Sequence, residues 1–201
     1  MALSLQAAPA ALPPGAARAP LGRPGVEGLS GSLELNQDGG HASLRIVGET
    51  TQIAMPETGI GLIPDVGGTL ILARAPGRVG EYLGLTGARI GAADAIYAGF
   101  ADRFLPQADW PRVIAALEET GDPSVVPPSG TPAPGHLADR RPQIEAGFGG
   151  ATIHDIVATL TATDTEFARE TLKILRRASA LSLEATLRLV RMTRATPMIR
   201  E

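Results

Sequence analysis

Cysteine is absent from the 201-residue chain, and aromatic residues make up only 3% of it. Without a thiol, the chain forms no disulfide, binds no metal through thiolates and uses no cysteine nucleophile. The histidines are also few and far apart in the sequence, and they are His41, His136 and His154. None of them shares a metal-ligand spacing with another, so we expect no metal site.

Long apolar runs and an excess of charge are missing as well. No run approaches the roughly 20 apolar residues that cross a bilayer. The formal net charge is −3 and the sequence pI is about 5.7, so electrostatics give no basis for nucleic-acid binding. We therefore expect a cytoplasmic protein with neither a membrane nor a nucleic acid as partner. The hydrophobic content of 44% suffices for a core in one domain, with or without an appendage.

The stretch that carries chemistry covers residues 55–69 and reads MPETGIGLIPDVGGT. Its two acids, Glu57 and Asp65, lie in otherwise uncharged, apolar sequence, so we expect both to be buried. Pro56 and Pro64 fix the backbone before each acid, and the glycines let it bend. Two rigidly held acids in an apolar pocket suit acid–base chemistry. The structural alternative is that Asp65 caps the helix that follows and Glu57 is a surface turn residue.

Residues 41–106 resemble the enoyl-CoA hydratase/isomerase, or crotonase, superfamily. Residues 54–58 (AMPET) and 61–68 (GLIPDVGG) are similar to its 3-hydroxyisobutyryl-CoA hydrolase branch. Hydratases of the superfamily usually carry a small residue where Asp65 stands. The other matching runs are PGRVGEYLGLTGARI (76–90), DAIYAGFA (94–101) and, more weakly, LSLEATLR (181–188).

The resemblance implies an α/β fold, a partial crotonase-like ββα spiral followed by a helical C-terminal region. It also implies an acyl-CoA substrate whose thioester carbonyl lies between two backbone amides that stabilise an oxyanion or enolate. Glu57 would be the catalytic carboxylate, as base or nucleophile, and Asp65 would orient the substrate hydroxyl or tune Glu57. Met55, Ile60 and Ile63 would form apolar walls that bind the substrate. This chemistry needs neither a metal nor a redox cofactor.

The activity implied by the branch is hydrolysis of an acyl-CoA thioester, 3-hydroxyisobutyryl-CoA, in valine breakdown. Two alternatives stay open: a hydratase or isomerase of the same superfamily, and a non-catalytic remnant. The family's early strands and its Gly-rich oxyanion segment have no counterpart ahead of His41, since the corresponding place, near residues 33–36, contains no glycine. We therefore expect a truncated, weakly active or inactive chain. Apolar faces on residues 43–55 and 69–86 would lack partners and favour self-association.

The resemblance and the composition of each segment together predict the domain organisation. Residues 1–40 are expected to be a non-homologous, disordered N-terminus, because prolines interrupt them and they show no period. A transit peptide is the weaker alternative for this segment. The partial crotonase-like domain would cover residues 41–201, with a spiral core portion at 41–106. Residues 107–201 would be helical, with a proline-rich linker at 121–135.

Periodicity and breakers predict the individual elements. Strands are expected at 32–35, twice within 43–54 around a turn at 48–49, and at 100–105. Helices are expected at 67–75, 78–86, 91–98, 110–120, 153–162, 165–178 and 183–194, with Asp109, Thr152, Asp164 and Ser182 as caps. Leu183, Thr186, Leu187 and Val190 share one face of the last helix. Arg188, Arg191 and Arg194 would form a solvated basic face or, alternatively, a docking site for CoA phosphates.

Overall fold

The computed structural model describes residues 31–37 and 40–196, so the disordered tail expected over residues 1–30 lies outside the described residues. The short strand expected at 32–35 is present and longer, so the segment 1–40 is not irregular throughout. The elements are β1 (Gly31–Gln37), β2 (Gly40–Val47), η1 (Glu57–Ile60), α1 (Gly68–Arg74), α2 (Val79–Thr86), α3 (Ala92–Tyr97), β3 (Arg103–Phe104), η2 (Gln107–Asp109), α4 (Trp110–Thr120), η3 (Pro123–Val125), α5 (Leu137–Gly147), α6 (Ile153–Thr163), α7 (Glu166–Leu175) and α8 (Ala180–Ala195).

The sheet is small and has the order β1-β2-β3. β1 pairs antiparallel with β2, from Gly31 opposite Ile46 to Gln37 opposite Gly40, whereas β2 pairs parallel with β3. The parallel pair needs a crossover, and α1, α2 and α3 supply it. The second strand expected within 43–54 is not formed. Only an isolated bridge between Ile53 and Ile90 marks its place.

α1 and α2 form where the sequence predicts them, because local signals separate and end them. The chain between them contains Gly77 at φ +52°, and Gly87 ends α2 at φ +62°, both in the left-handed region that glycine tolerates. A Cβ on Gly80 would overlap the carbonyl of Leu72, so the two helices approach each other closely. Every residue of α2 is buried, which places this helix at the centre of the core.

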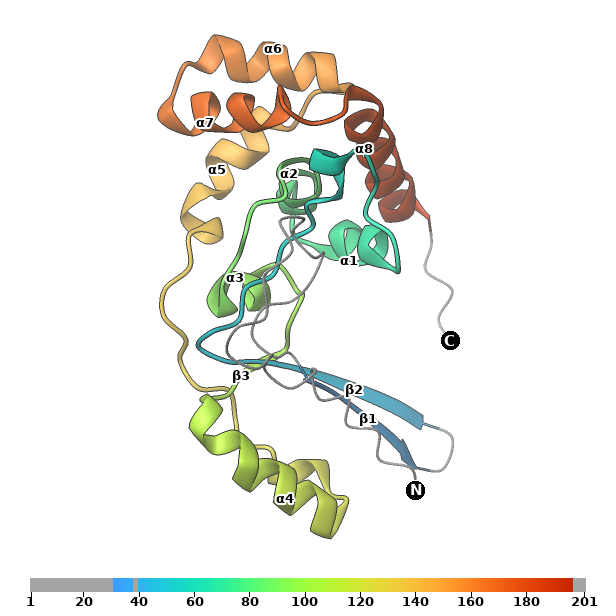
Figure 1. Cartoon of the computed structure of the whole chain (residues 1–201), viewed down its shortest axis with the longest axis vertical. Helices are drawn as coiled ribbons and strands as arrows, with labels where there is room; N and C mark the ends of the chain where they lie inside the picture. Colours follow the sequence, from blue (N-terminus) through green and yellow to red (C-terminus); the bar gives the residue numbers. More distant parts are fainter. Residues whose placement is uncertain (1–30, 38–39, 197–201) are drawn as a thin grey trace, which may run out of the picture.

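The last helix, α8, covers α1 and α2 (Figure 1). Its predicted inner face is confirmed, since Leu183, Thr186, Leu187 and Val190 are all buried. At the other end of the molecule, α4 packs Val113 and Leu117 against a small cluster of its own. Most of the proline-rich segment 121–135 is irregular, as expected, apart from the 3-10 turn η3.

α5 was not expected from the sequence. It contains Pro142, and only Leu137, Ile144 and Gly147 are buried, so its apolar signal is weak. Its start depends on a distant residue: the carboxylate of Asp94, on α3, accepts hydrogen bonds from the backbone amides of His136 and Leu137 at 2.8 and 2.9 Å. This tertiary cap takes the place of a local one.

Three of the four expected helix caps need correction. Thr152 caps α6 through a capping box with Asp155, as predicted. Thr165 rather than Asp164 caps α7, and Ser179 rather than Ser182 caps α8. Asp109 stands at the cap position of α4 but makes no side-chain cap hydrogen bond.

Among the described residues, no helix is both long and apolar enough to cross a membrane.

Candidate active site

Glu57 begins the single turn η1, which lies beside α2 and the start of α8 (Figure 1). Upstream, backbone hydrogen bonds in both directions join Ile53 and Ile90 at 2.9 Å. Within the turn, the amide of Leu62 donates to the carbonyl of Glu57 at 2.9 Å. The chain is therefore held by backbone hydrogen bonds just before and just after this acid.

One oxygen of the Glu57 carboxylate has no partner among the described residues. The side chain is partly buried, and its Oε2 is buried without a hydrogen bond to any of residues 31–37 or 40–196. Leaving a buried polar atom unpaired costs about 1–3 kcal/mol, so folded proteins rarely do it without a reason. An oxygen in this state can accept a hydrogen bond or a proton from a group that enters the site. The surface-turn interpretation of Glu57 does not account for it.

Asp65 differs from Glu57 in its surroundings. It is exposed, so the burial expected for both acids holds only in part and only for Glu57. The cap interpretation of Asp65 is wrong as well, because Gly67 is the cap residue of α1 and makes no side-chain cap bond. Asp65 contributes to the start of α1 through its backbone, because its carbonyl accepts a hydrogen bond from the amide of Gly68 at 2.6 Å. The hydrogen bonds among the described residues do not join the two carboxylates.

The three residues predicted to form apolar walls of the substrate site also differ in burial. Met55 is partly buried and packs against the main core. Ile60 and Ile63, in contrast, are 61% and 37% exposed. Together with the exposed Leu62 and Val66 they form what we call the apolar loop, residues 60–66. The loop therefore does not close a pocket by itself.

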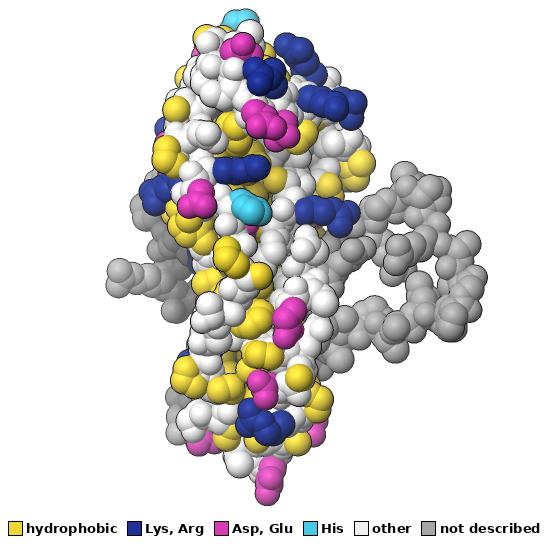
Figure 2. Space-filling model, turned by 90° about the vertical axis from the view of Figure 1, so that its left-hand side faces the viewer, with side chains coloured by type: hydrophobic (Ala, Val, Ile, Leu, Met, Phe, Trp, Pro, Cys, Tyr) yellow, Lys and Arg dark blue, Asp and Glu magenta, His cyan; other side chains and the backbone are white. Residues whose placement is uncertain are grey.

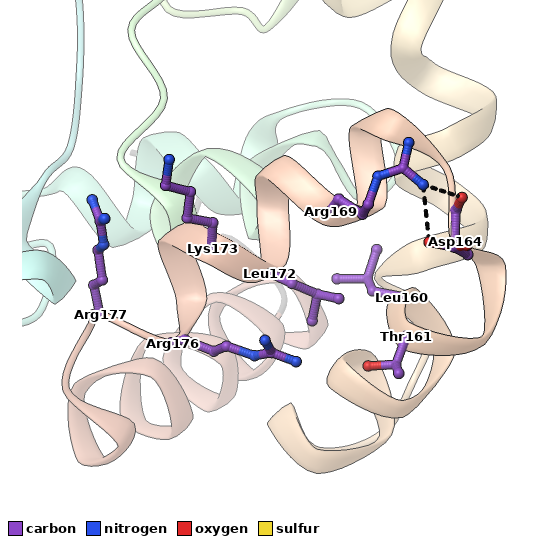
Figure 3. Close-up of a pocket in the computed structure, with 8 residues that line it drawn as sticks. All are labelled: Leu160, Thr161, Asp164, Arg169, Leu172, Lys173, Arg176 and Arg177. Atoms are coloured by element: carbon purple, nitrogen blue, oxygen red, sulfur yellow. Dashed lines mark hydrogen bonds and ion pairs between the residues drawn. The ribbon is translucent and has the colours of Figure 1, made fainter.

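A separate pocket of about 510 Å³ lies between α6 and α7 (Figure 3). None of the predicted site residues lines it, and its lining is Leu160, Thr161, Asp164, Arg169, Leu172, Lys173, Arg176 and Arg177. Arg169 donates to the carboxylate of Asp164 at 2.9 Å. On the face seen in Figure 2, Lys and Arg side chains gather toward this helical end of the molecule. The pocket is cationic, and sequence reasoning did not single it out.

The arginines of α8 do not form the solvated basic face that the sequence predicts. Arg191 and Arg194 turn inward to Glu81 of α2, at 3.0 and 3.5 Å from its Oε1. Arg188 instead pairs with Glu184 of the same helix at 2.8 Å, and its side chain is 72% exposed, against 24% and 31% for the side chains of Arg191 and Arg194. The buried Glu81 is not identified from the sequence. The signal that could have identified it is an acid within the apolar run EYLGL.

Comparison with known proteins places these residues in a family. The sequence model of the family described as Enoyl-CoA hydratase/isomerase matches residues 39–201. Among curated proteins, the chain is 36% identical over 165 residues to a probable 3-hydroxyisobutyryl-CoA hydrolase of Arabidopsis thaliana. That alignment covers 75% of this chain and 43% of the relative. The mitochondrial 3-hydroxyisobutyryl-CoA hydrolase of Mus musculus is 32% identical, over 74% of this chain and 42% of its own.

Solved structures give the same family. An enoyl-CoA hydratase from Rhodobacter sphaeroides is 56% identical with a TM-score of 0.70, over 77% of this chain and 45% of the other. A carnitinyl-CoA dehydratase from Mycobacterium thermoresistibile is 39% identical with a TM-score of 0.71, over 76% and 45%. The matched part thus spans less than half the length of these relatives. With its small mixed sheet, its helical C-terminal region and the match over residues 39–201, the chain belongs to the enoyl-CoA hydratase/isomerase, or crotonase, family.

Proposed function

We propose that the chain carries the catalytic carboxylate of an acyl-CoA thioester hydrolase acting on 3-hydroxyisobutyryl-CoA. The observation that carries the proposal is the buried, unpartnered Oε2 of Glu57, on a turn that backbone hydrogen bonds fix before and after it. Names of the curated relatives support the substrate class, since they are 3-hydroxyisobutyryl-CoA hydrolases at 36% and 32% identity.

In the proposed reaction Glu57 handles the water that cleaves the thioester. As a base, its carboxylate takes a proton from water while the water oxygen attacks the carbonyl carbon. The C–S bond then breaks, and the proton passes from Glu57 to the departing CoA sulfur, leaving 3-hydroxyisobutyrate and CoA. As a nucleophile, Glu57 would attack the carbonyl carbon and the C–S bond would break, so that CoA leaves as a thiolate and takes up a proton; water would then hydrolyse the acyl–Glu57 anhydride to 3-hydroxyisobutyrate and free Glu57. Asp65, exposed in the apolar loop, would orient the substrate hydroxyl. Neither route calls for a metal or a redox cofactor.

The rate expected of the 201 residues alone is low. The resemblance to the family implies that the carbonyl oxygen lies between two backbone amides, one of them from a Gly-rich segment ahead of the position of His41. Loss of one oxyanion donor typically lowers kcat by about 10²–10³. We therefore expect slow turnover that still depends on Glu57.

A hydratase is the second candidate function. It is favoured by the 56% identity to the structure described as an enoyl-CoA hydratase, which exceeds the identity to the hydrolases. The acid at position 65 argues against it, because hydratases usually carry a small residue there. Turnover of an enoyl-CoA, in preference to 3-hydroxyisobutyryl-CoA, would decide for the hydratase.

The test of the proposal is release of CoA from 3-hydroxyisobutyryl-CoA, followed with a thiol reagent. The unaltered chain is compared with Glu57→Gln, which removes the base but keeps the shape of the side chain. Glu118→Gln on α4 is the matched control, because Glu118 is exposed and far from η1 in the fold. Release that falls to the uncatalysed rate only in Glu57→Gln supports the proposal. Equal release from all three chains contradicts it.

A further inference from the structure

We propose that Thr58 is a positioning residue for Glu57, which it fixes between the end of α2 and the start of α8. The inference rests on the proposed function, since it assigns a role toward the same carboxylate. Thr58 is 1% exposed, although it follows an acid in a surface turn. A hydroxyl group buried this deeply usually has a hydrogen-bond partner.

The side chain of Thr58 is paired with α2. Its Oγ1 donates to the carbonyl of Leu85 at 3.2 Å and approaches that of Gly84 at 3.5 Å. Both carbonyls belong to the last turn of α2, whose carbonyls have no partner within the helix. The hydroxyl thus satisfies an otherwise unpaired helix end. Removing it would leave a buried acceptor unsatisfied.

The backbone of Thr58 is paired with α8. Its carbonyl accepts from the amide of Ser179 at 3.2 Å. Ser179 is the cap of α8, and its hydroxyl accepts from the amide of Ser182. The residue directly after Glu57 is therefore bonded to two helices that are distant in sequence.

The residue before Glu57 is held as well. A Cβ on Gly87, in the left-handed end of α2, would come within 3.0 Å of the Cα of Pro56. The backbone of α2 therefore packs directly on this proline. Glu57 stands between a packed neighbour and a hydrogen-bonded neighbour, whereas the apolar loop beyond it is exposed.

Catalysis is sensitive to this arrangement, because a displacement of about 1 Å can lower the rate about 10²-fold. Thr58→Val keeps the shape of the side chain but loses the donor. We expect it to lower kcat at least ~10-fold with KM changed less than ~2-fold, since the carboxylate remains but is no longer held in place. Thr58→Ser restores the hydroxyl and should return kcat to within ~3-fold of the unaltered chain.

Thr186→Val is the matched control. Thr186 is also a buried threonine beside α2, but its Oγ1 has no hydrogen-bond partner in the part of the chain that the structure describes, so the same substitution removes none of the described bonds. Its kcat should stay within ~2-fold of the unaltered chain. Should Thr58→Val fail to fold, Thr58→Ala carries the same test without the added methyl group.

A second measurement separates this inference from the proposed function. Amide hydrogen exchange at Gly59 and Leu62 reports the two backbone bonds of the turn, Gly59 to Pro56 and Leu62 to Glu57. Thr58→Val should speed their exchange ~5-fold or more, and Thr58→Ser and Thr186→Val should not. If the unaltered chain releases no CoA, the proposed function fails while exchange still decides whether Thr58 fixes the turn. Unchanged exchange together with unchanged kcat in Thr58→Val overturns the inference.

Discussion

Replacing Glu81 by Gln should destabilise the fold well beyond what a surface substitution does. The side chain is 0% exposed, and one of its oxygens, Oε1, faces three guanidinium groups from two helices. These donors are Arg78 at 2.9 Å, Arg191 at 3.0 Å and Arg194 at 3.5 Å. The other oxygen, Oε2, is buried without a partner. Glu81→Gln would leave three cations converging on a neutral group.

The size of the effect follows from two opposing contributions. Breaking a buried ion pair by neutralising one partner costs about 3–5 kcal/mol. The arginines are 24–33% exposed and can regain water, and Arg191 keeps its bonds to the carbonyls of Phe148 and Ala151. The amide group that replaces Oε2 would be just as buried and would find no partner there, so that position offers no compensating gain. We therefore expect a loss of about 2–3 kcal/mol, a large part of a typical stability of about 5–15 kcal/mol.

The assay is urea unfolding at pH 7, followed by circular dichroism. Glu184→Gln is the matched control, because it makes the same change at a partly exposed acid, which pairs with Arg188 within α8 and accepts from the backbone amide of Ile153, interactions worth together about 1 kcal/mol. Stabilities that differ by less than about 0.5 kcal/mol between the two variants would refute the reasoning, since they would show that the buried carboxylate contributes no more than the partly exposed one.

Three further predictions concern other sites. Asp65→Asn should weaken turnover but change the free energy of unfolding by less than about 0.5 kcal/mol, because its side chain does not cap α1. Hydrogen bonds from Arg45 hold the pKa of Asp102 below its usual range, so its contribution is present above the unfolded pKa of about 4 and lost as pH falls through the folded pKa. Asp102→Asn should therefore cost about 1 kcal/mol in thermal or urea unfolding at pH 7, and progressively less as the pH is lowered through the folded pKa. Leu62→Ser should reduce self-association measured by sedimentation velocity, because Leu62 is a 56% exposed part of the apolar loop; an unchanged sedimentation profile would contradict that role.

Local signals account for what the sequence predicted well. The glycines at 77 and 87 separate and end α1 and α2, and each acts through its own backbone conformation. The inner face of α8 follows from a 3.6-residue period, which depends only on neighbours along the chain. The motif around Glu57 predicts a catalytic role for this acid, which stays a prediction, and the structure adds an oxygen without a partner among the described residues.

Contacts between distant segments account for what was missed. The first amides of α5 are capped by the carboxylate of Asp94, which lies 43 residues before Leu137 in the sequence. No local sequence pattern therefore predicts this helix start. The sequence predicts a solvated face for the arginines of α8 because the partner of Arg191 and Arg194, Glu81, lies on another helix and cannot be inferred from the spacing within α8. Similarly, the exposure of Asp65 depends on which segments cover the apolar loop, and sequence spacing carries no information about that.

The most direct test of the account is the release of CoA from 3-hydroxyisobutyryl-CoA by the unaltered chain and by Glu57→Gln. It concerns the one acid that combines the family motif with a buried, unpaired oxygen. We expect slow release of CoA from the unaltered chain and none above background from Glu57→Gln. Release that is the same in both chains would contradict the assignment of Glu57 as the catalytic carboxylate.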